Sequence, residues 1–470
     1  MRLNARRIRR REWLQSMVAA PALIGLTARG QNTATWKAGV AKADITPTES
    51  IWLAGYGART RPSEGVLQKI YLKCVALQSA DGAPSAWVTS DLLGFPRDVS
   101  EAIVAECAAK HKLPRERLIL NASHTHSAPV VGRMLRPAYP AFTKQQEDAI
   151  SRYTDDLVKK VVATIGEALA DLQPAEVSFG QGLAGFGVNR RRVRLRNLPG
   201  PVDHDVPVLS VKQPGGKPRA ILFGYACHNT SLGDYRVNGD WAGFAQHELE
   251  QRFPGALACF VQGCGADINP IPRYQGNDPV LSSYTVELPR MYGSILGAAV
   301  AIALDSGMQR VSGPLSAALR TVDLPFHHIP TREEFETRLK DKSDANVYRR
   351  RHAEQMLSQL DRGGKLPDRY PYPVQVWRFG KDMALISLAG EVVVDYSLRL
   401  KAQHGWNNTW VSGYCNDVFA YIPSRRVLLE GGYEGADAMI VYGQPAPFGS
   451  AVEELIIEQV SDLMNETRQT

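Results

Sequence analysis

Short apolar runs of β type alternate with amphipathic helical patterns along most of this chain. Such alternation favours an α/β architecture, because strands and the helices that cover them then follow one another in sequence. The runs that predict strands are residues 69–78, 86–90, 117–120, 220–226, 257–261, 374–378, 383–388 and 409–411. The helical patterns are residues 100–111, 145–172, 242–252, 290–305 and 392–404, and a further helix is expected near 450–465.

One segment departs from this alternation. Residues 331–362 are rich in charge on most faces of the expected helices, which predicts a surface helix pair more than a lid. Gly363-Gly364 and the prolines at 367, 371 and 373 then indicate a loop.

Composition indicates a globular protein whose basic charge lies in one place. The chain has 470 residues, 44% of them hydrophobic, which is ample for one large domain or two or three smaller ones. The formal net charge is +7, but the first 30 residues hold seven arginines against one glutamate, so the remainder is close to neutral. The charge therefore gives no reason to expect nucleic-acid binding.

The N-terminus reads as a targeting segment. Arg10-Arg11-Glu12-Trp13-Leu14-Gln15 resembles the twin-arginine export motif, and the apolar stretch at about 17–26 is too short to span a bilayer. We expect residues 1–30 to be a signal peptide cleaved near Gln31, residues 31–470 to be the mature domain, and the protein to be periplasmic or secreted. An uncleaved helix lying on the membrane surface is the alternative.

The cysteines do not predict a metal site of their own. No Cys-x-x-Cys occurs among the six, so a thiolate zinc knuckle is not indicated. Pairing cannot be read from their spacing, and most are expected to be buried as small hydrophobic side chains.

The segment with the most chemistry is residues 121–129, in which His124 and His126 follow an apolar run. If the segment is extended, residues i and i+2 point to the same side. One imidazole could then hold a metal while the other acts on a substrate beside it. A hydrogen-bonded histidine pair without a metal is the plain alternative.

Three other apolar runs end in a polar residue able to bind a metal. The run at 220–227 leads into His228, the run at 383–390 leads into Glu391, and residues 410–417 lead on to Tyr421. Ligands of open α/β sheets collect beyond the carboxyl ends of strands. Two neutral imidazoles and a carboxylate suit zinc and leave room for water. Singly, each residue has a plain reading, since Glu391 could simply favour a helix N-terminus.

These motifs together resemble the neutral/alkaline non-lysosomal ceramidase family, specifically its catalytic domain. Matching stretches are spread over residues 36–450: the opening strand at 39–47, His124-Thr125-His126-Ser127, His228-Asn229-Thr230-Ser231 with Gly239-Asp240, Gly390-Glu391, and Tyr421 with Tyr433-Glu434-Gly435. The ordered set is more specific than any one motif. The resemblance implies a domain of mixed β-sheets flanked by helices.

The resemblance also implies the site and its cofactor. It implies one Zn2+ per chain, held by His124, His228, Glu391 and Tyr421. It assigns His126 to proton transfer beside the metal and Tyr433 to the substrate carbonyl. An active-site arginine matches Arg190, although the register among Arg190, Arg191 and Arg192 stays open.

The chain departs from the family pattern in three places. Asn269 stands where the family has a serine, in Ala266-Asp267-Ile268-Asn269-Pro270. The family's cysteine-containing middle region is not visible, and the charged residues 331–362 lie in the corresponding part. No C-terminal immunoglobulin-like domain is expected in this chain.

Together with the export motif, the resemblance predicts an exported, zinc-dependent hydrolase of linear amide bonds that cleaves ceramide or a related N-acyl amide by means of a metal-activated water. The alternatives are a metal hydrolase of the same fold acting on a non-lipid amide, ester or glycan-derived substrate, and a non-catalytic binding protein. The expected partners are a small-molecule or lipid substrate and, transiently, a membrane surface; the oligomeric state stays open.

Overall fold

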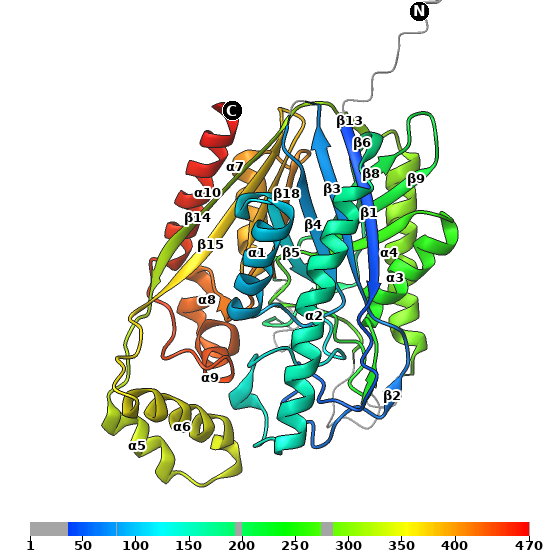
Figure 1. The fold of residues 1–470 in the computed structure, drawn as a ribbon. Coiled ribbons are helices and arrows are strands. Elements are labelled where there is room, and N and C mark those ends of the chain that lie inside the picture. The colour runs from blue at the N-terminus through cyan, green and yellow to red at the C-terminus, as the bar shows by residue number, and fades with distance from the viewer. Residues whose placement is uncertain (1–35, 81, 193–199, 274–284, 470) are drawn as a thin grey trace, which may run out of the picture. The chain divides into compact units, whose positions relative to one another are not determined.

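Two β-sheets lie face to face in this protein, with helices on their outer sides (Figure 1). The computed structural model describes residues 36–80, 82–192, 200–273 and 285–469. Residues 34–470 belong to one unit. The predicted α/β class with mixed sheets flanked by helices is confirmed.

The larger sheet is mixed. Its strand order is β11-β9-β8-β6-β1-β3-β4-β5, with β13 beside β6. Most neighbours are antiparallel, while β4 with β5 and β9 with β11 run parallel. The strands are β1 (Trp36–Asp44), β3 (Tyr71–Ser79), β4 (Ser85–Ser90), β5 (Leu118–Ala122), β6 (Gln173–Leu183), β8 (Asp205–Lys212), β9 (Pro218–Tyr225), β11 (Leu257–Gln262) and β13 (Gln309–Val311).

The smaller sheet has the order β14-β15-β16-β18, and only β16 and β18 run parallel. Its strands are β14 (Leu315–Pro325), β15 (Arg369–Phe379), β16 (Met383–Leu388) and β18 (Thr409–Ser412). Three short pairs complete the described strands: β2 (Gly65–Val66) with β10 (Arg236–Val237), β7 (Gly187–Asn189) with β12 (Ile268–Pro270), and β17 (Glu391–Val392) with β19 (Tyr421–Ile422).

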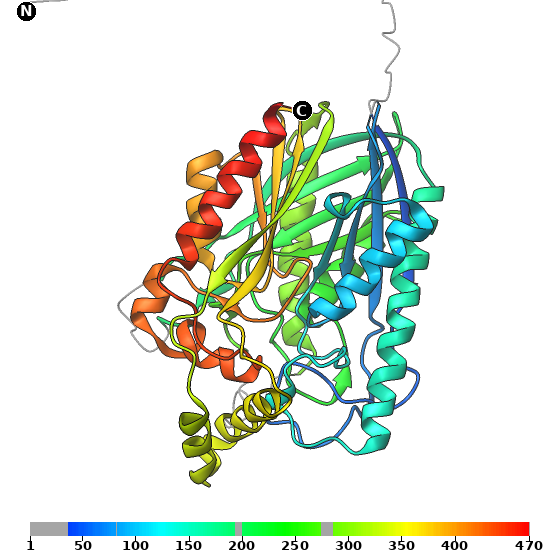
Figure 2. The same cartoon turned by 60° about the vertical axis from the view of Figure 1, so that its left-hand side comes forward.

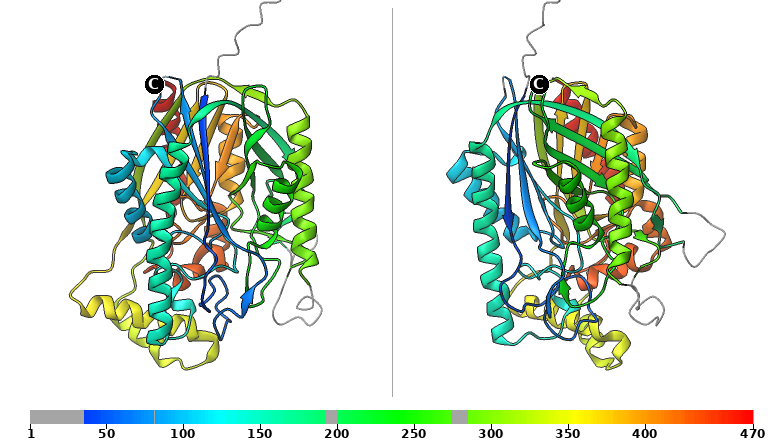
Figure 3. Two further views of the ribbon diagram at one scale, coloured as in Figure 1. Left: turned by 45° about the vertical axis from the view of Figure 1, so that its right-hand side comes forward. Right: turned by 90° about the vertical axis from the view of Figure 1, so that its right-hand side faces the viewer.

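Each face of each sheet is buried by a different partner. Trp87, Trp377 and Trp410 are among the side chains that fill the core between the two sheets. Helices α1 (Arg97–His111) and α2 (Lys144–Ala170) cover one half of the larger sheet, and α3 (Asp240–Arg252) and α4 (Glu287–Asp305) cover the other (Figure 3). Helices α7 (Val394–His404) and α10 (Val452–Gln469) pack on the smaller sheet (Figure 2).

The predicted elements are found within a few residues of their expected bounds. The charged segment 331–362 forms α5 (Arg332–Lys340) and α6 (Val347–Asp361), which confirms a helix pair. Strands β6, β8 and β14 were not predicted. All six cysteines are free and buried, as expected for most of them. The proposed signal segment lies outside the described residues, and among those that are described no helix is long and apolar enough to cross a membrane.

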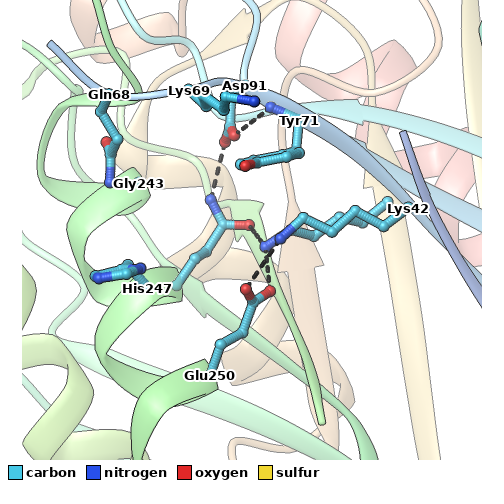
Figure 4. A pocket seen from close by; sticks show the side chains of 10 residues that line it. Lys42, Gln68, Lys69, Tyr71, Asp91, Gly243, His247 and Glu250 are labelled. Atoms are coloured by element: carbon cyan, nitrogen blue, oxygen red, sulfur yellow. Dashed lines mark hydrogen bonds and ion pairs between the residues drawn. The ribbon is translucent and has the colours of Figure 1, made fainter. Parts of the chain in front are cut away.

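A polar cavity between the larger sheet and α3 is satisfied by its own side chains (Figure 4). The buried Lys73 ammonium donates to Glu250 at 2.7 Å and to Gln246 at 3.0 Å, and Gln246 in turn donates to the buried Asp91. Lys42 bonds the other oxygen of Glu250. Because each charge already has a partner, this network serves to join the helix to the sheet.

Candidate metal centre and active site

Four strands end at one place. His124 follows β5, His228 follows β9, Glu391 follows β16, and Tyr421 lies beyond β18. Glu391 and Tyr421 are direct register partners in the short parallel pair β17 and β19. Isolated bridges from Asn121 to Cys415 and from Gly263 to Ser412 join the carboxyl ends of the two sheets. The polar residues predicted at these strand ends therefore lie at one physical location.

The segment that carries His124 and His126 is not extended, so the condition under which residues i and i+2 point to the same side is not met. Strand β5 ends at Ala122, and His124 has a left-handed backbone with φ of 61°. Residues other than glycine seldom adopt this conformation, which costs about 1–3 kcal/mol and is typical of functional sites. The two rings nevertheless meet, with their Nε2 atoms 3.3 Å apart. A tight turn, and not strand alternation, places the imidazoles together.

The four predicted metal ligands direct their donor atoms at one another. Oε2 of Glu391 lies 3.1 Å from Nε2 of His124 and 3.2 Å from Nε2 of His228. The Tyr421 hydroxyl is 3.4 Å from Nε2 of His228. Ligand atoms around a tetrahedral zinc, each about 2.0–2.1 Å from the ion, are about 3.3 Å apart. The spacing in this site therefore fits such an ion.

The protonation of the two histidines strengthens this fit. Nδ1 of His124 lies 2.7 Å from the Leu93 carbonyl oxygen, and Nδ1 of His228 lies 2.8 Å from that of Gly265. A carbonyl only accepts, so each Nδ1 carries a proton, and each ring turns its Nε2 toward Glu391. Burial lowers the pKa of His228 to about 4, which keeps that ring neutral at neutral pH. Because Nδ1 of each ring is fixed as a donor, Nε2 is the nitrogen of each ring that can bind a metal.

Glu391 is held as a carboxylate. Burial alone would raise its pKa, but the neighbouring His124 and His228 imidazoles hold the pKa well below its ordinary value. Its second oxygen, Oε1, accepts a hydrogen bond of 2.5 Å from the buried Tyr442 hydroxyl. Tyr442 was not predicted from the sequence, because it follows the short helix α9 (Ala438–Val441) and belongs to none of the motifs that resemble the family.

His126 differs from the other two histidines in its surroundings. Its Nδ1 is buried and has no hydrogen-bond partner among the described residues. Its backbone carbonyl is held instead, by the Arg59 guanidinium at 2.7 Å. Burial, together with the adjacent His124 and His228, lowers the pKa of His126 well below its ordinary value. The ring is thus neutral and is not anchored at its second nitrogen.

The three histidines also form a possible ligand set of their own. One ligand atom from each of His124, His126 and His228 lies within 4.8 Å of the others. Metal-binding imidazoles almost always donate their other N–H to a fixed acceptor. His124 and His228 meet that requirement, whereas His126 does not. The set of His124, His228, Glu391 and Tyr421 is therefore the better candidate.

The arginine register left open by the sequence is resolved. Arg190 donates from Nη2 to the Tyr421 hydroxyl at 3.1 Å and from Nε to Glu434 at 2.6 Å. Arg191 and Arg192 turn to the carboxylates of Glu434 and Glu430. Burial raises the pKa of Tyr421, and the Arg190 charge acts in the opposite direction. Arg190 is thus the arginine that faces the site.

A cavity of about 230 Å³ opens onto these groups. His124, His126, Glu391, Tyr421 and Tyr442 line one part of it. The remaining lining is mostly apolar or glycine: Gly55, Gly57, Leu93, Leu135, Ala138, Val441, Tyr348 and Tyr433. Tyr433, 44% exposed, places its ring 5.3 Å from that of Tyr421.

Other residues of the family-like motifs stabilise the loops of the site by hydrogen bonds. Asp240, at φ of 50°, accepts hydrogen bonds from the Ser231 hydroxyl and from three backbone N–H groups of the two loop ends. Asn229 donates to the Ser123 carbonyl next to His124. Asn269, where the family has a serine, lies in β12, and the preceding Ile268 carbonyl accepts from the His228 N–H at 3.0 Å. These residues fix the loops that carry His124 and His228.

Comparison with known proteins gives one consistent result. The family model described as "Neutral/alkaline non-lysosomal ceramidase, N-terminal" matches residues 36–270, half of the chain. A neutral ceramidase of Mycobacterium tuberculosis is 25% identical over 256 residues, 48% of this chain and 39% of that protein. Neutral ceramidase B of Dictyostelium discoideum is 21% identical over 268 residues, 52% of this chain and 37% of that protein. These matches span less than two fifths of either relative.

Solved structures show the same fold over most of the chain. The crystal structure of neutral ceramidase from Pseudomonas aeruginosa superimposes with a TM-score of 0.71 at 20% identity, covering 93% of this chain and 75% of that one. A structure titled "Ceramidase complexed with C2" also gives 0.71, at 19% identity, covering 92% and 76%. At these identities the likeness establishes the fold.

Proposed function

Because the chain belongs to the neutral/alkaline non-lysosomal ceramidase family, we propose that it is a zinc-dependent hydrolase that cleaves the amide bond of ceramide or a related N-acyl amide. The observation that carries the proposal is the buried cluster of His124, His228 and Glu391 at the cavity. There the Nε2 atoms of His124 and His228 lie 3.1 and 3.2 Å from Oε2 of Glu391. Two imidazoles and a carboxylate that are buried together are a typical set of zinc ligands.

The proposed ligands are His124, His228, Glu391 and Tyr421, and each supplies a nitrogen or oxygen donor. Zinc held by such donors supplies a Lewis acid that polarises a carbonyl and lowers the pKa of water. Burial holds the His228 imidazole neutral and Glu391 is held as a carboxylate, which are the protonation states that metal ligands need.

His126 is proposed to transfer protons. Its Nε2 lies 3.3 Å from that of His124 and lines the cavity, so it could take a proton from water and deliver it to the leaving amine. Its free Nδ1 leaves the ring able to exchange protons, since no acceptor fixes its tautomer. The Tyr433 hydroxyl, which lines the same cavity, is proposed to stabilise the oxyanion. Arg190 is proposed to support the oxyanion by its charge and by its hydrogen bond to the Tyr421 hydroxyl.

Metal content is the first test. Protein purified without chelators should contain about one zinc per chain. Replacement of His124 or His228 by alanine should remove most of it, because each change deletes one ligand. Circular dichroism of the same samples controls for folding. Full zinc content in both folded variants would place the ion elsewhere.

The substrate needs a panel in which only the scissile group varies. Zinc-loaded protein would be assayed with an N-acyl sphingoid base, a short N-acyl amine, the matching ester and an N-acetylated sugar, with His228→Ala as the inactive control. Cleavage of the N-acyl sphingoid base, absent in the control, is the expected result. Cleavage of only the ester or the sugar would favour a hydrolase of the same fold with another substrate. A zinc-loaded protein that cleaves none would instead indicate a binding protein.

Export by the twin-arginine route is a separate proposal. It is supported by Arg10-Arg11 followed by the short apolar stretch at about 17–26. Replacing both arginines by lysine keeps the charge and should leave the full-length precursor in the cytoplasm. N-terminal sequencing of exported protein should find a start near Gln31. Normal export of the lysine variant would refute this route.

A further inference from the structure

The connection between β14 and β15 is far longer than the strands require. These strands pair antiparallel along their whole length, ending with Pro325 opposite Arg369. A turn of two residues can join such a pair. Instead, residues 326–368 extend away from the sheet and form the α5–α6 hairpin (Figure 2). Its own small core is Phe335, Ala353, Met356 and Leu357.

The α5–α6 hairpin is fastened to the elements that surround the cavity. Arg351 donates to the carbonyl of Ala138, in the short 3-10 helix Arg136–Ala138, at 3.3 Å. The buried His352 bonds the Gln444 carbonyl, just after α9, at 2.7 Å. Ala138 lines the catalytic cavity, as does the last residue of α9, Val441. The hairpin therefore has a fixed place at this side of the site.

Tyr348, at the start of α6, is the described residue by which the hairpin enters the cavity lining. Its hydroxyl approaches Gly57 so closely that a Cβ at that position would lie 2.7 Å from it. No described residue forms a hydrogen bond with this hydroxyl. A polar group in a mostly apolar part of the lining is thus left free to bind a ligand.

The size of the cavity limits which part of a substrate can meet Tyr348. About 230 Å³ is below the range of about 300–1,000 Å³ usual for ligand sites. The cavity therefore admits the scissile amide and its immediate neighbours, and the long chains of a lipid must extend outside. In an N-acyl sphingoid base the polar groups next to the amide are the hydroxyls on the amine side.

From this geometry we propose that Tyr348 is a specificity-determining residue whose hydroxyl binds a hydroxyl of the substrate on the amine side of the scissile amide. The assignment rests on the proposed amidase function and names the side of the substrate that the hairpin recognises. A site that hydrogen-bonds a substrate hydroxyl discriminates strongly against an analogue that lacks it, because a polar group is then left unpaired. The α5–α6 hairpin would then give this chain a substrate preference of its own within the shared fold.

The test compares Tyr348→Phe with the wild type on substrates that carry or lack each hydroxyl. Three substrates are compared: an N-acyl sphingoid base, its analogue without the primary hydroxyl, and its analogue without the secondary hydroxyl. Tyr348→Phe should lower kcat/KM for the complete substrate about 3- to 12-fold, the usual effect of one neutral hydrogen bond. For one of the two analogues the same change should alter kcat/KM less than about twofold, since the partner is already absent. Zinc content should be unchanged.

Glu354→Gln is the matched control, because Glu354 is an exposed residue of the same helix. It should leave all three values unchanged. An equal loss on all three substrates, or no loss with Tyr348→Phe, would overturn the assignment while the amidase function stands. A zinc-loaded wild-type protein inactive on all three would overturn the proposed function and this assignment with it.

Discussion

The hydrogen bond from Tyr442 to Glu391 offers a sharp test of the metal centre. The Tyr442 hydroxyl donates to Oε1 at 2.5 Å, while Oε2 faces the two histidines. If Glu391 binds the metal through Oε2, Tyr442 orients the ligand from its other side. Tyr442→Phe removes this one hydroxyl and leaves the ring that packs at the cavity.

The size of the effect follows from the type of bond. A hydrogen bond to a charged group contributes about 1.5–3 kcal/mol, and about 1.4 kcal/mol corresponds to a factor of ten. Loss of an outer partner of a metal ligand typically weakens metal binding about 10- to 100-fold. Both estimates agree, so the zinc Kd of Tyr442→Phe should rise by one to two orders of magnitude.

Tyr414 provides the control. Its ring lies 4.5 Å from that of His124, and its hydroxyl is buried without a hydrogen-bond partner among the described residues. Tyr414→Phe also removes a phenol oxygen beside the site but breaks no bond, so its zinc Kd should stay within about threefold of the wild type. Competition with a chromogenic chelator measures all three proteins. If Tyr442→Phe also stays within threefold, or if both variants weaken alike, Glu391 is not held as a ligand in this way.

Three further outcomes are expected. His126→Ala and Tyr433→Phe should keep their zinc and have a lower kcat, reduced about 10²–10⁴-fold for His126→Ala. If His126→Ala loses zinc in step with activity, His126 is a ligand. Burial lowers the pKa of His352 to about 4. As the pH drops from about 6.5 to 4, the unfolded chain therefore binds a proton before the folded protein does, and stability falls. His352→Gln keeps a hydrogen-bond donor and should make the thermal-unfolding temperature depend less on pH in that range. Glu250→Ala leaves the buried Lys73 ammonium without a carboxylate partner (Figure 4) and should lower the free energy of unfolding by about 3 kcal/mol, with zinc content unchanged; a loss under about 1 kcal/mol would show that the pair is not needed.

The sequence predicted the strands that carry the site because their signals are strong. Residues 118–122, 218–225 and 383–388 are almost wholly buried and therefore read as continuous apolar runs that end in a polar residue. Strand β6 was missed because its buried residues alternate with polar residues and glycine. Its pairing with β1 and β8 supplies the order that the local pattern lacks.

The details of the site depended on contacts that no local pattern encodes. The left-handed backbone of His124 is imposed by its surroundings, since its N–H donates to the Leu92 carbonyl and its Nδ1–H to that of Leu93. Tyr442 reaches Glu391 across 51 positions of the chain. Arg190 was already the candidate from the sequence, but the choice among the three arginines depended on Arg191 and Arg192 turning to Glu434 and Glu430. Each of these depends on where two distant segments meet.

The origin of the proposed ligands connects metal binding to the packing of the two sheets. His124 and His228 follow strands of the larger sheet, whereas Glu391 and Tyr421 follow strands of the smaller one. An ion bound by all four would therefore link the sheets at their carboxyl ends, beside the core that Trp87, Trp377 and Trp410 fill. The Nε2 atoms of His124 and His228 lie 3.1–3.2 Å from Oε2 of Glu391, so the two sheets already bring these donors together. Metal occupancy and the close packing of these sheet ends should then favour one another, since an ion that binds only the packed arrangement stabilises it.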